Sequence, residues 1–303
     1  MKAYQPSHIV PAGGWVMLLT AAVLGGAAIG WGVSLLSNLV YLILIFPLLM
    51  GVIGGTILSA AVRTGKVRSP AAAIGAAVLM TLVMYGSMWA SDYVQFRTIA
   101  LADLQTSTPG LDPAQADARI DSVLKYQTGQ DGFVGYVLYE DQQGVSLGRV
   151  GSDQNQFNLG PVFSWAYWAV EVLIILWGVV RFGKKQADQP FCELCGQWYE
   201  KPLQLGSLGA SRTKEVISLV ENGQFVKLGE ELQANPALPN VAVFTAGSAK
   251  DCVNGEMLLL VRSQVRDSRG NPTGKDLARG MISAAEAQEL QRGVQNRRAL
   301  YGY

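Results

Sequence analysis

Four long apolar segments, separated by charged connectors, constrain this chain more than any other feature. They cover residues 15–36, 39–62, 71–90 and 162–180. At 1.5 Å rise per residue, a helix of about 20 residues crosses the roughly 30 Å hydrocarbon core of a bilayer. The sequence therefore predicts an α-helical membrane protein with four transmembrane helices. We expect the first segment to be retained, because its apolar core is longer than that of a signal peptide and no A-x-A-like cleavage site follows it.

Basic residues beside the apolar segments predict the orientation of the chain. One cluster, Arg63, Lys66 and Arg68, follows the second segment, and another, Arg181, Lys184 and Lys185, follows the fourth. Such flanks stay in the cytoplasm. We therefore predict a multi-pass protein of a bacterial inner membrane with both termini in the cytoplasm and residues 91–160 outside. The predicted outside stretch agrees, since it carries nine acidic and four basic residues, against thirteen acidic and sixteen basic from Arg181 onward.

The positions of the three cysteines bear on the same question. Cys192, Cys195 and Cys252 all fall in the predicted cytoplasmic tail, and the predicted outside stretch has none. Because thiols persist in reducing compartments, this distribution is consistent with a cytoplasmic tail.

The segment around Cys192 and Cys195 is the most specific local motif. Two cysteines spaced C-x-x-C and followed by Gly196 resemble half of a zinc ribbon. A complete site would need further ligands, for which the chain offers Cys252 and, remotely, His8. Three interpretations stay open: a knuckle without metal, a zinc site completed within the chain or between protomers, and a redox dithiol.

Small residues recur at helix-packing spacing inside the apolar segments. Gly26 with Gly30, and Gly51 with Gly55, are four residues apart. Such pairs let helix backbones approach closely. They predict either packing within the bundle, or self-association or docking to another membrane protein.

Glu171 is the one charged residue inside an apolar segment. A carboxylate near the bilayer midplane is costly, so we expect it to face the bundle interior, to be protonated, or to accept a hydrogen bond from Tyr85, Thr81, Thr20 or water. Its role is left open between a structural glutamic acid, a proton or cation path, and a polar contact to a partner subunit.

The apolar segments divide the chain into four parts. Residues 1–90 hold the first three helices, 91–160 an extracytoplasmic domain, 161–181 the fourth helix and 182–303 a cytoplasmic domain. In the extracytoplasmic part, Asp112 and Pro113 predict a helix that ends before Gly129. Two β-prone runs, 135–140 and 144–150, predict a hairpin after it, which gives a small α/β domain.

The cytoplasmic part is predicted to be an α+β domain that bears the zinc-ribbon-like knuckle. Its expected elements are a helix over 211–220, strands over 241–245 and 257–261, and a final helix. Ser283 and Glu286 form a capping box that opens this last helix.

No catalytic motif is complete in this sequence. Gly144, Ser146 and Gly148 match the spacing of a serine-hydrolase elbow, but they lie in a predicted hairpin, and His8 is the only histidine. A net charge of +1 indicates no nucleic-acid partner. We therefore expect a non-enzymatic accessory, scaffold or regulatory subunit whose partners are lipids and membrane proteins or a second copy of itself. The alternative is a small transporter or proton-coupled channel centred on Glu171.

Overall fold

The computed structural model describes residues 4–37, 45–144, 146–147, 157–158, 160–233, 238–247, 256–269 and 272–301. The chain forms two compact units. We call His8–Ala187 the helical unit, and Met1–Ser7 together with Asp188–Tyr303 the tail unit.

The described residues of the helical unit include four helices that are long and apolar enough to cross a membrane, as the sequence predicts. The first is built from α1 (Ala12–Thr20), a π-helical turn (Ala21–Gly25) and α2 (Gly26–Ser37), and the others are α3 (Ile45–Thr64), α4 (Pro70–Ser107) and α7 (Gly160–Ala187). Large apolar side chains on their outer faces are exposed, among them Leu24, Leu82 and Leu173. An apolar surface of this kind is typical of a protein in contact with lipid.

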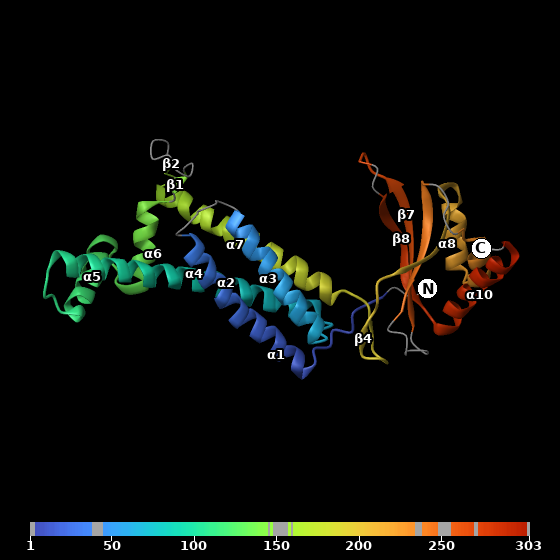
Figure 1. The fold of residues 1–303 in the computed structure, drawn as a ribbon, viewed down its shortest axis with the longest axis horizontal. Helices are drawn as coiled ribbons and strands as arrows, with labels where there is room; N and C mark the ends of the chain where they lie inside the picture. Colours follow the sequence, from blue (N-terminus) through green and yellow to red (C-terminus); the bar gives the residue numbers. More distant parts are fainter. Residues whose placement is uncertain are drawn as a thin grey trace. The chain divides into compact units, whose positions relative to one another are not determined.

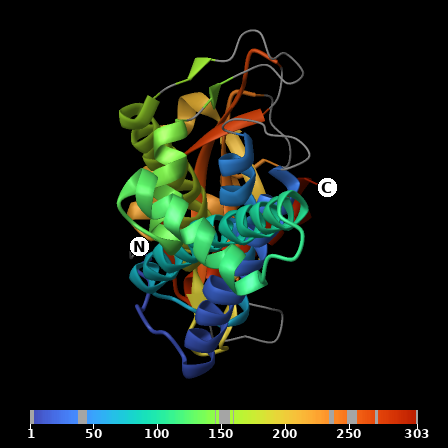
Figure 2. The same cartoon turned by 90° about the vertical axis from the view of Figure 1, so that its left-hand side faces the viewer.

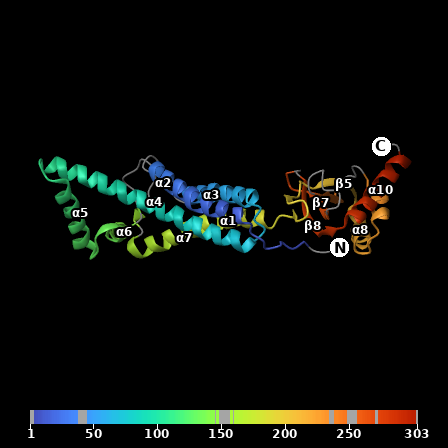
Figure 3. The same ribbon diagram turned by 90° about the horizontal axis from the view of Figure 1, so that it is seen from below.

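Helix α4 is much longer than a membrane span. It begins where Ser69 accepts a hydrogen bond from the Ala72 N–H (3.3 Å) and Pro70 occupies the first turn. Its 38 residues extend over about 57 Å, almost twice the thickness of a hydrocarbon core. In Figure 3, α4 continues beyond α2 and α3 and reaches α5. The predicted outside region therefore starts as a continuation of the third apolar helix.

Two further helices pack at this end of α4, and one of them corrects the sequence prediction. Helix α5 (Pro113–Thr128) lies where we expected it, with Gly129 as its left-handed C-cap. The predicted hairpin is wrong, because residues 132–143 form helix α6 (Gly132–Gln143). Among the described residues that follow, two short strands, β1 (Ser146–Leu147) and β2 (Phe157–Asn158), pair with each other. The described part of the predicted α/β domain is therefore mainly helical. Figure 2 shows the helical unit from the end at which α5 lies.

The reason for the helix over 132–143 lies in its packing. Tyr136 is buried, and Tyr139 stands almost one turn further along the same helix. Both rings contact Phe96 of α4, with ring centroids 5.1 and 6.0 Å apart. The intrinsic preference of aromatic residues is for β-strands. Here a helix places both tyrosines on one face, where they pack against α4.

Glycines allow the apolar helices to approach each other closely. At the α2–α4 crossing, a Cβ on Gly26 would lie 3.1 Å from the Met80 carbonyl oxygen, and one on Gly30 would overlap the backbone of Met84. At the α3–α7 crossing, a Cβ on Gly51 would lie 3.2 Å from the Ile175 carbonyl oxygen. A Cβ on Gly55 would lie 3.0 Å from the Gly178 carbonyl oxygen. The structure thus places all four predicted packing glycines at contacts within the chain.

The tail unit is a four-stranded antiparallel sheet covered by helices on one face. The strand order is β5 (Leu203–Gly209), β6 (Asn240–Ala246), β7 (Met257–Arg266) and β8 (Pro272–Ile282). Helices α8 (Thr213–Glu221) and α9 (Phe225–Glu231) connect β5 to β6, and α10 (Ala284–Tyr301) follows β8. Figure 1 shows α8 and α10 on the same side of the strands.

The core of the tail unit lies between this sheet and its helices. Its fully buried members include Leu228, Leu259 and Leu290. The predicted strands over 241–245 and 257–261 are present. The predicted capping box is also present: the Ser283 N–H donates to the Glu286 carboxylate at 2.7 Å, and the Glu286 N–H donates to the Ser283 hydroxyl at 3.3 Å. A separate hairpin of β3 (Phe191–Cys192) and β4 (Gln197–Trp198) occupies the position of the predicted knuckle.

Candidate functional site

A cavity of about 270 Å³ lies among α2, α3, α4, α6 and α7, and three carboxylates line it. They are Asp92 on α4, Glu140 on α6 and Glu171 on α7. Each carboxylate therefore comes from a different helix. The three residues are far apart in the sequence, and the fold brings them to one cavity. We call this cavity the carboxylate pocket.

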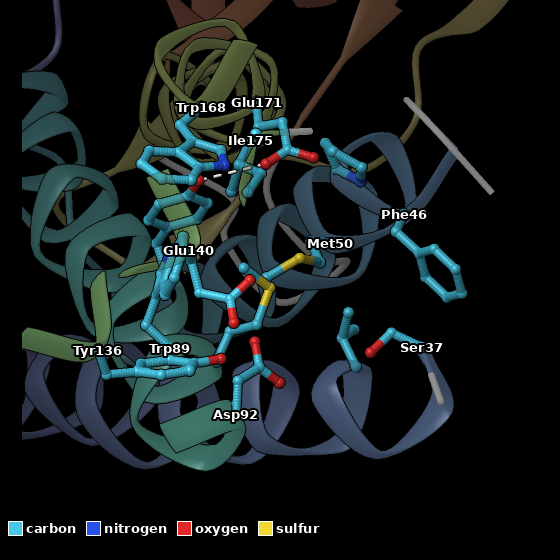
Figure 4. Close-up of a pocket in the computed structure, with 15 residues that line it drawn as sticks. Ser37, Phe46, Met50, Trp89, Asp92, Tyr136, Glu140, Trp168, Glu171 and Ile175 are labelled. Atoms are coloured by element: carbon cyan, nitrogen blue, oxygen red, sulfur yellow. Dashed lines mark hydrogen bonds between the residues drawn. The ribbon is translucent and has the colours of Figure 1, made fainter. Parts of the chain in front are cut away.

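Glu171 is the most deeply buried of the three, with 6% of its surface exposed. Its carboxylate accepts a hydrogen bond from the Tyr85 hydroxyl at 3.2 Å, drawn as a dashed line in Figure 4. Tyr85 is one of the partners expected from the sequence. Thr81 instead donates to the Ala77 carbonyl, and Thr20 is exposed. An acid inside a membrane-spanning helix usually faces the bundle interior and finds a polar partner, and Glu171 does both.

Asp92 and Glu140 were missed by the sequence analysis. Figure 4 shows them on the side of the pocket opposite Glu171. Burial raises the pKa of Glu140, and the nearby charge of Asp92 raises it further. Tyr136, which also lines the pocket, donates its hydroxyl to the Glu140 carboxylate. Burial and the charges of Glu140 and Asp92 raise the pKa of Tyr136. The group is thus able to take up a proton or a cation.

Aromatic rings form much of the remaining wall. The indoles of Trp89 and Trp168 meet edge to face with centroids 4.9 Å apart, and Trp89 also contacts Tyr85 and Tyr136 at 6.4 and 6.2 Å. These rings hold α4, α6 and α7 together around the pocket. Tyr85, Trp89 and Trp168 also border a second, almost entirely apolar groove of about 620 Å³.

A polar network beside the pocket joins α2 to α4. The hydroxyl of Ser34 lies 2.5 Å from the Asp92 carboxylate and 2.9 Å from the Ser91 hydroxyl, and it accepts a bond from Gln95 at 2.8 Å. Ser34 and Ser91 are both fully buried. The network fixes the orientation of the Asp92 side chain at the pocket wall.

The cysteine motif is separate from this pocket and lies in the tail unit. Cys192 is a buried thiol on β3, whereas Cys195 is disulfide-bonded. Cys252 lies outside the described residues. Within the part of the chain that the structure describes, no group of three His, Cys, Asp or Glu residues is placed to hold a metal. A sulfur in a disulfide cannot act as a thiolate ligand. Zinc binding by these cysteines stays a prediction that metal analysis of the purified protein would test.

The disulfide also affects the argument about compartments. Disulfides are typical of oxidising compartments, while we expected reduced thiols in the tail. The cysteines therefore no longer support a cytoplasmic tail. The predicted orientation now depends on the basic flanks and on the excess of acidic residues in the predicted outside stretch.

The hydrolase-like motif is not assembled as a nucleophile elbow. Gly144 is the C-cap of α6, Ser146 lies in the two-residue strand β1, and Gly148 lies outside the described residues. Lys125, a lysine of the same region that could in principle serve as a base for Ser146, forms a 3.6 Å ion pair with Asp131. An elbow needs a strand followed by a helix, and here a helix is followed by a strand.

Comparisons of the chain with protein-family models, with curated proteins and with solved structures found no match.

Proposed function

We propose that the chain is an integral membrane accessory, scaffold or regulatory subunit that acts through protein partners and has no catalytic activity of its own. It would lie in a bacterial inner membrane, with lipids and other membrane proteins, or a second copy of itself, as its partners. The observation that carries this proposal is the combination of two units with separate hydrophobic cores in one chain. A folded domain attached to a membrane bundle is suited to recruiting or positioning other proteins.

Helix α7 gives this proposal a physical link between the two units. It is one continuous helix from Gly160 to Ala187, and it carries Glu171 in its middle. The tail unit resumes at Asp188, immediately after its last residue. A change in the environment of Glu171 would therefore act on the same rigid element that leads into the tail unit.

Purification in a mild detergent tests this proposal. We expect the full-length chain to co-purify with another membrane protein, or with a second copy, at a fixed stoichiometry that native mass spectrometry can measure. The complex should persist after a wash in high salt if packed apolar surfaces hold it together. A monomeric protein that supports ion flux by itself in liposomes would contradict the proposal.

The second candidate is a small transporter or proton-coupled channel centred on Glu171. The carboxylate pocket favours it, because a buried acid with a hydroxyl partner is typical of a proton or cation path. In proteoliposomes, Glu171→Gln should then abolish flux, a loss of at least about 100-fold, while the exposed substitution Asp103→Asn on α4 should not. If Glu171 is structural, the same substitution changes only thermal stability or assembly, and this candidate fails.

A further inference from the structure

The three carboxylates of the carboxylate pocket line one cavity but do not converge on one point. Asp92, Glu140 and Glu171 all contribute to its surface. Yet among the described residues no three acidic, histidine or cysteine side chains are close enough to share a metal ion. A ligand that satisfies all three must therefore carry its positive charge at separate positions.

The aromatic wall is a second observation, independent of the acids. Trp89, Trp168, Tyr85 and Tyr136 present rings to the same cavity, together with the aliphatic side chains of Met50 and Ile175. Ring faces attract ammonium groups, and rings and aliphatic side chains together accommodate methylene groups. A small inorganic ion would use neither surface.

The remaining chemistry of the pocket excludes an anionic ligand. Among the residues that line it in the described structure there is no lysine, arginine or histidine. The volume of about 270 Å³ lies just below the usual range for drug-sized ligands, so the ligand must be small.

We propose that the carboxylate pocket binds an aliphatic diamine or short polyamine. Its ammonium groups pair with Glu171 at one side and with Asp92 and Glu140 at the other, and its methylene chain lies against Trp89, Trp168 and Met50. The site does not depend on the proposed accessory role, since ligand binding and partner binding can be measured separately.

Isothermal titration of the full-length protein in detergent tests this proposal, with 1,4-diaminobutane as the probe and n-butylamine as its matched control. The two share a chain length but differ in the number of ammonium groups. We expect the diamine to bind at least about tenfold more tightly than the monoamine, because only the diamine carries a second ammonium group to pair with a second carboxylate. Equal affinities for the two amines, or no binding of the diamine, would overturn the proposal. Magnesium chloride at equal ionic strength should not displace the diamine; displacement would show a metal site instead.

Substitutions of the acidic residues test whether the diamine binds in the carboxylate pocket. Glu140→Gln and Asp92→Asn should each weaken diamine binding about tenfold. The exposed substitution Asp103→Asn, on the same helix as Asp92, should leave it unchanged. Thermal unfolding without ligand shows whether each variant is folded. If folded Glu140→Gln and Asp92→Asn proteins bind the diamine as well as the unsubstituted chain does, the amine binds elsewhere and the proposal fails.

Proton release gives a readout that a non-specific surface effect would not produce. Glu140 faces Asp92 on α4, Tyr136 on its own helix, and Tyr85 and Glu171 across the pocket. Burial and Asp92 raise its pKa, and a bound ammonium would lower it again. Diamine binding at a pH at which Glu140 is partly protonated should therefore release protons, which titrations in buffers of different ionisation enthalpy measure. Glu140→Gln should reduce this release, and unchanged release in that variant would contradict the assignment.

Discussion

Replacing Gly30 with alanine is expected to separate α2 from α4 and to lower the free energy of unfolding of the helical unit by about 1–2 kcal/mol. A Cβ at this position would overlap the Met84 carbonyl and the Ser87 hydroxyl, and the carbonyl cannot move without displacing α4. Overpacking of this kind costs about 1–3 kcal/mol, from which the higher helix propensity of alanine recovers up to about 1 kcal/mol. Gly30→Leu should have a larger effect. Thermal or denaturant-induced unfolding in detergent measures both.

Gly32, on the same helix, provides the matched control. A Cβ there has no neighbour within 4 Å, so Gly32→Ala should be neutral or slightly stabilising. Ser87 also donates to the Ala27 carbonyl across the α2–α4 crossing at 3.4 Å, and this bond should be lost together with the packing in the Gly30 variants. Equal stability of the Gly30→Ala and Gly32→Ala proteins would show that the two helices are not as close as the structure places them.

Signals that depend on the local sequence predicted the fold well. A long apolar segment must hydrogen-bond its own backbone in lipid, so helices over the four segments follow from composition alone. The Ser283–Glu286 capping box and the Asp112–Pro113 start of α5 are also local. Each fixes a helix terminus by hydrogen bonds or a backbone preference that involves only a few neighbouring residues.

Features that depend on distant contacts were not predictable. Residues 135–140 have a strand-like composition, but the aromatic residues of α4 provide a surface on which a helix buries Tyr136. The error concealed Glu140 as well. Read as a helix, the segment would have placed Tyr136 and Glu140 on one face, since residues four apart lie on one side. That spacing is the signal that could have indicated a second acid beside the bundle.

The location of the carboxylate pocket could be only partly predicted. Glu171 was visible because it is the one charge in an apolar segment. Asp92 stands just beyond the predicted third span, where an acidic residue is common and gives no reason to expect burial. Its role follows from the length of α4 beyond the span and from the docking of α6, neither of which a hydropathy pattern specifies.

The orientation of the chain should give an all-or-none labelling result. Ser107→Cys places an exposed thiol at the far end of α4, and Lys214→Cys places one on α8 in the tail unit. With the basic flanks in the cytoplasm, a membrane-impermeant maleimide added to intact cells should label the Ser107→Cys protein and leave the Lys214→Cys protein unlabelled until the membrane is permeabilised. The unsubstituted chain serves as the blank for its native cysteines.

Two other patterns of labelling would each contradict the predicted orientation. Labelling at Lys214→Cys alone would place both termini outside, where the Cys195 disulfide would be stable in an oxidising compartment. The carboxylate pocket would then lie near the cytoplasmic end of the bundle, where it would meet the amines of the cell interior. Labelling at both positions in intact cells would mean that α7, the apolar helix between them, does not cross the bilayer. In that case Glu171 would not be an intramembrane acid. Both the transport hypothesis and the predicted orientation of the chain would then be wrong.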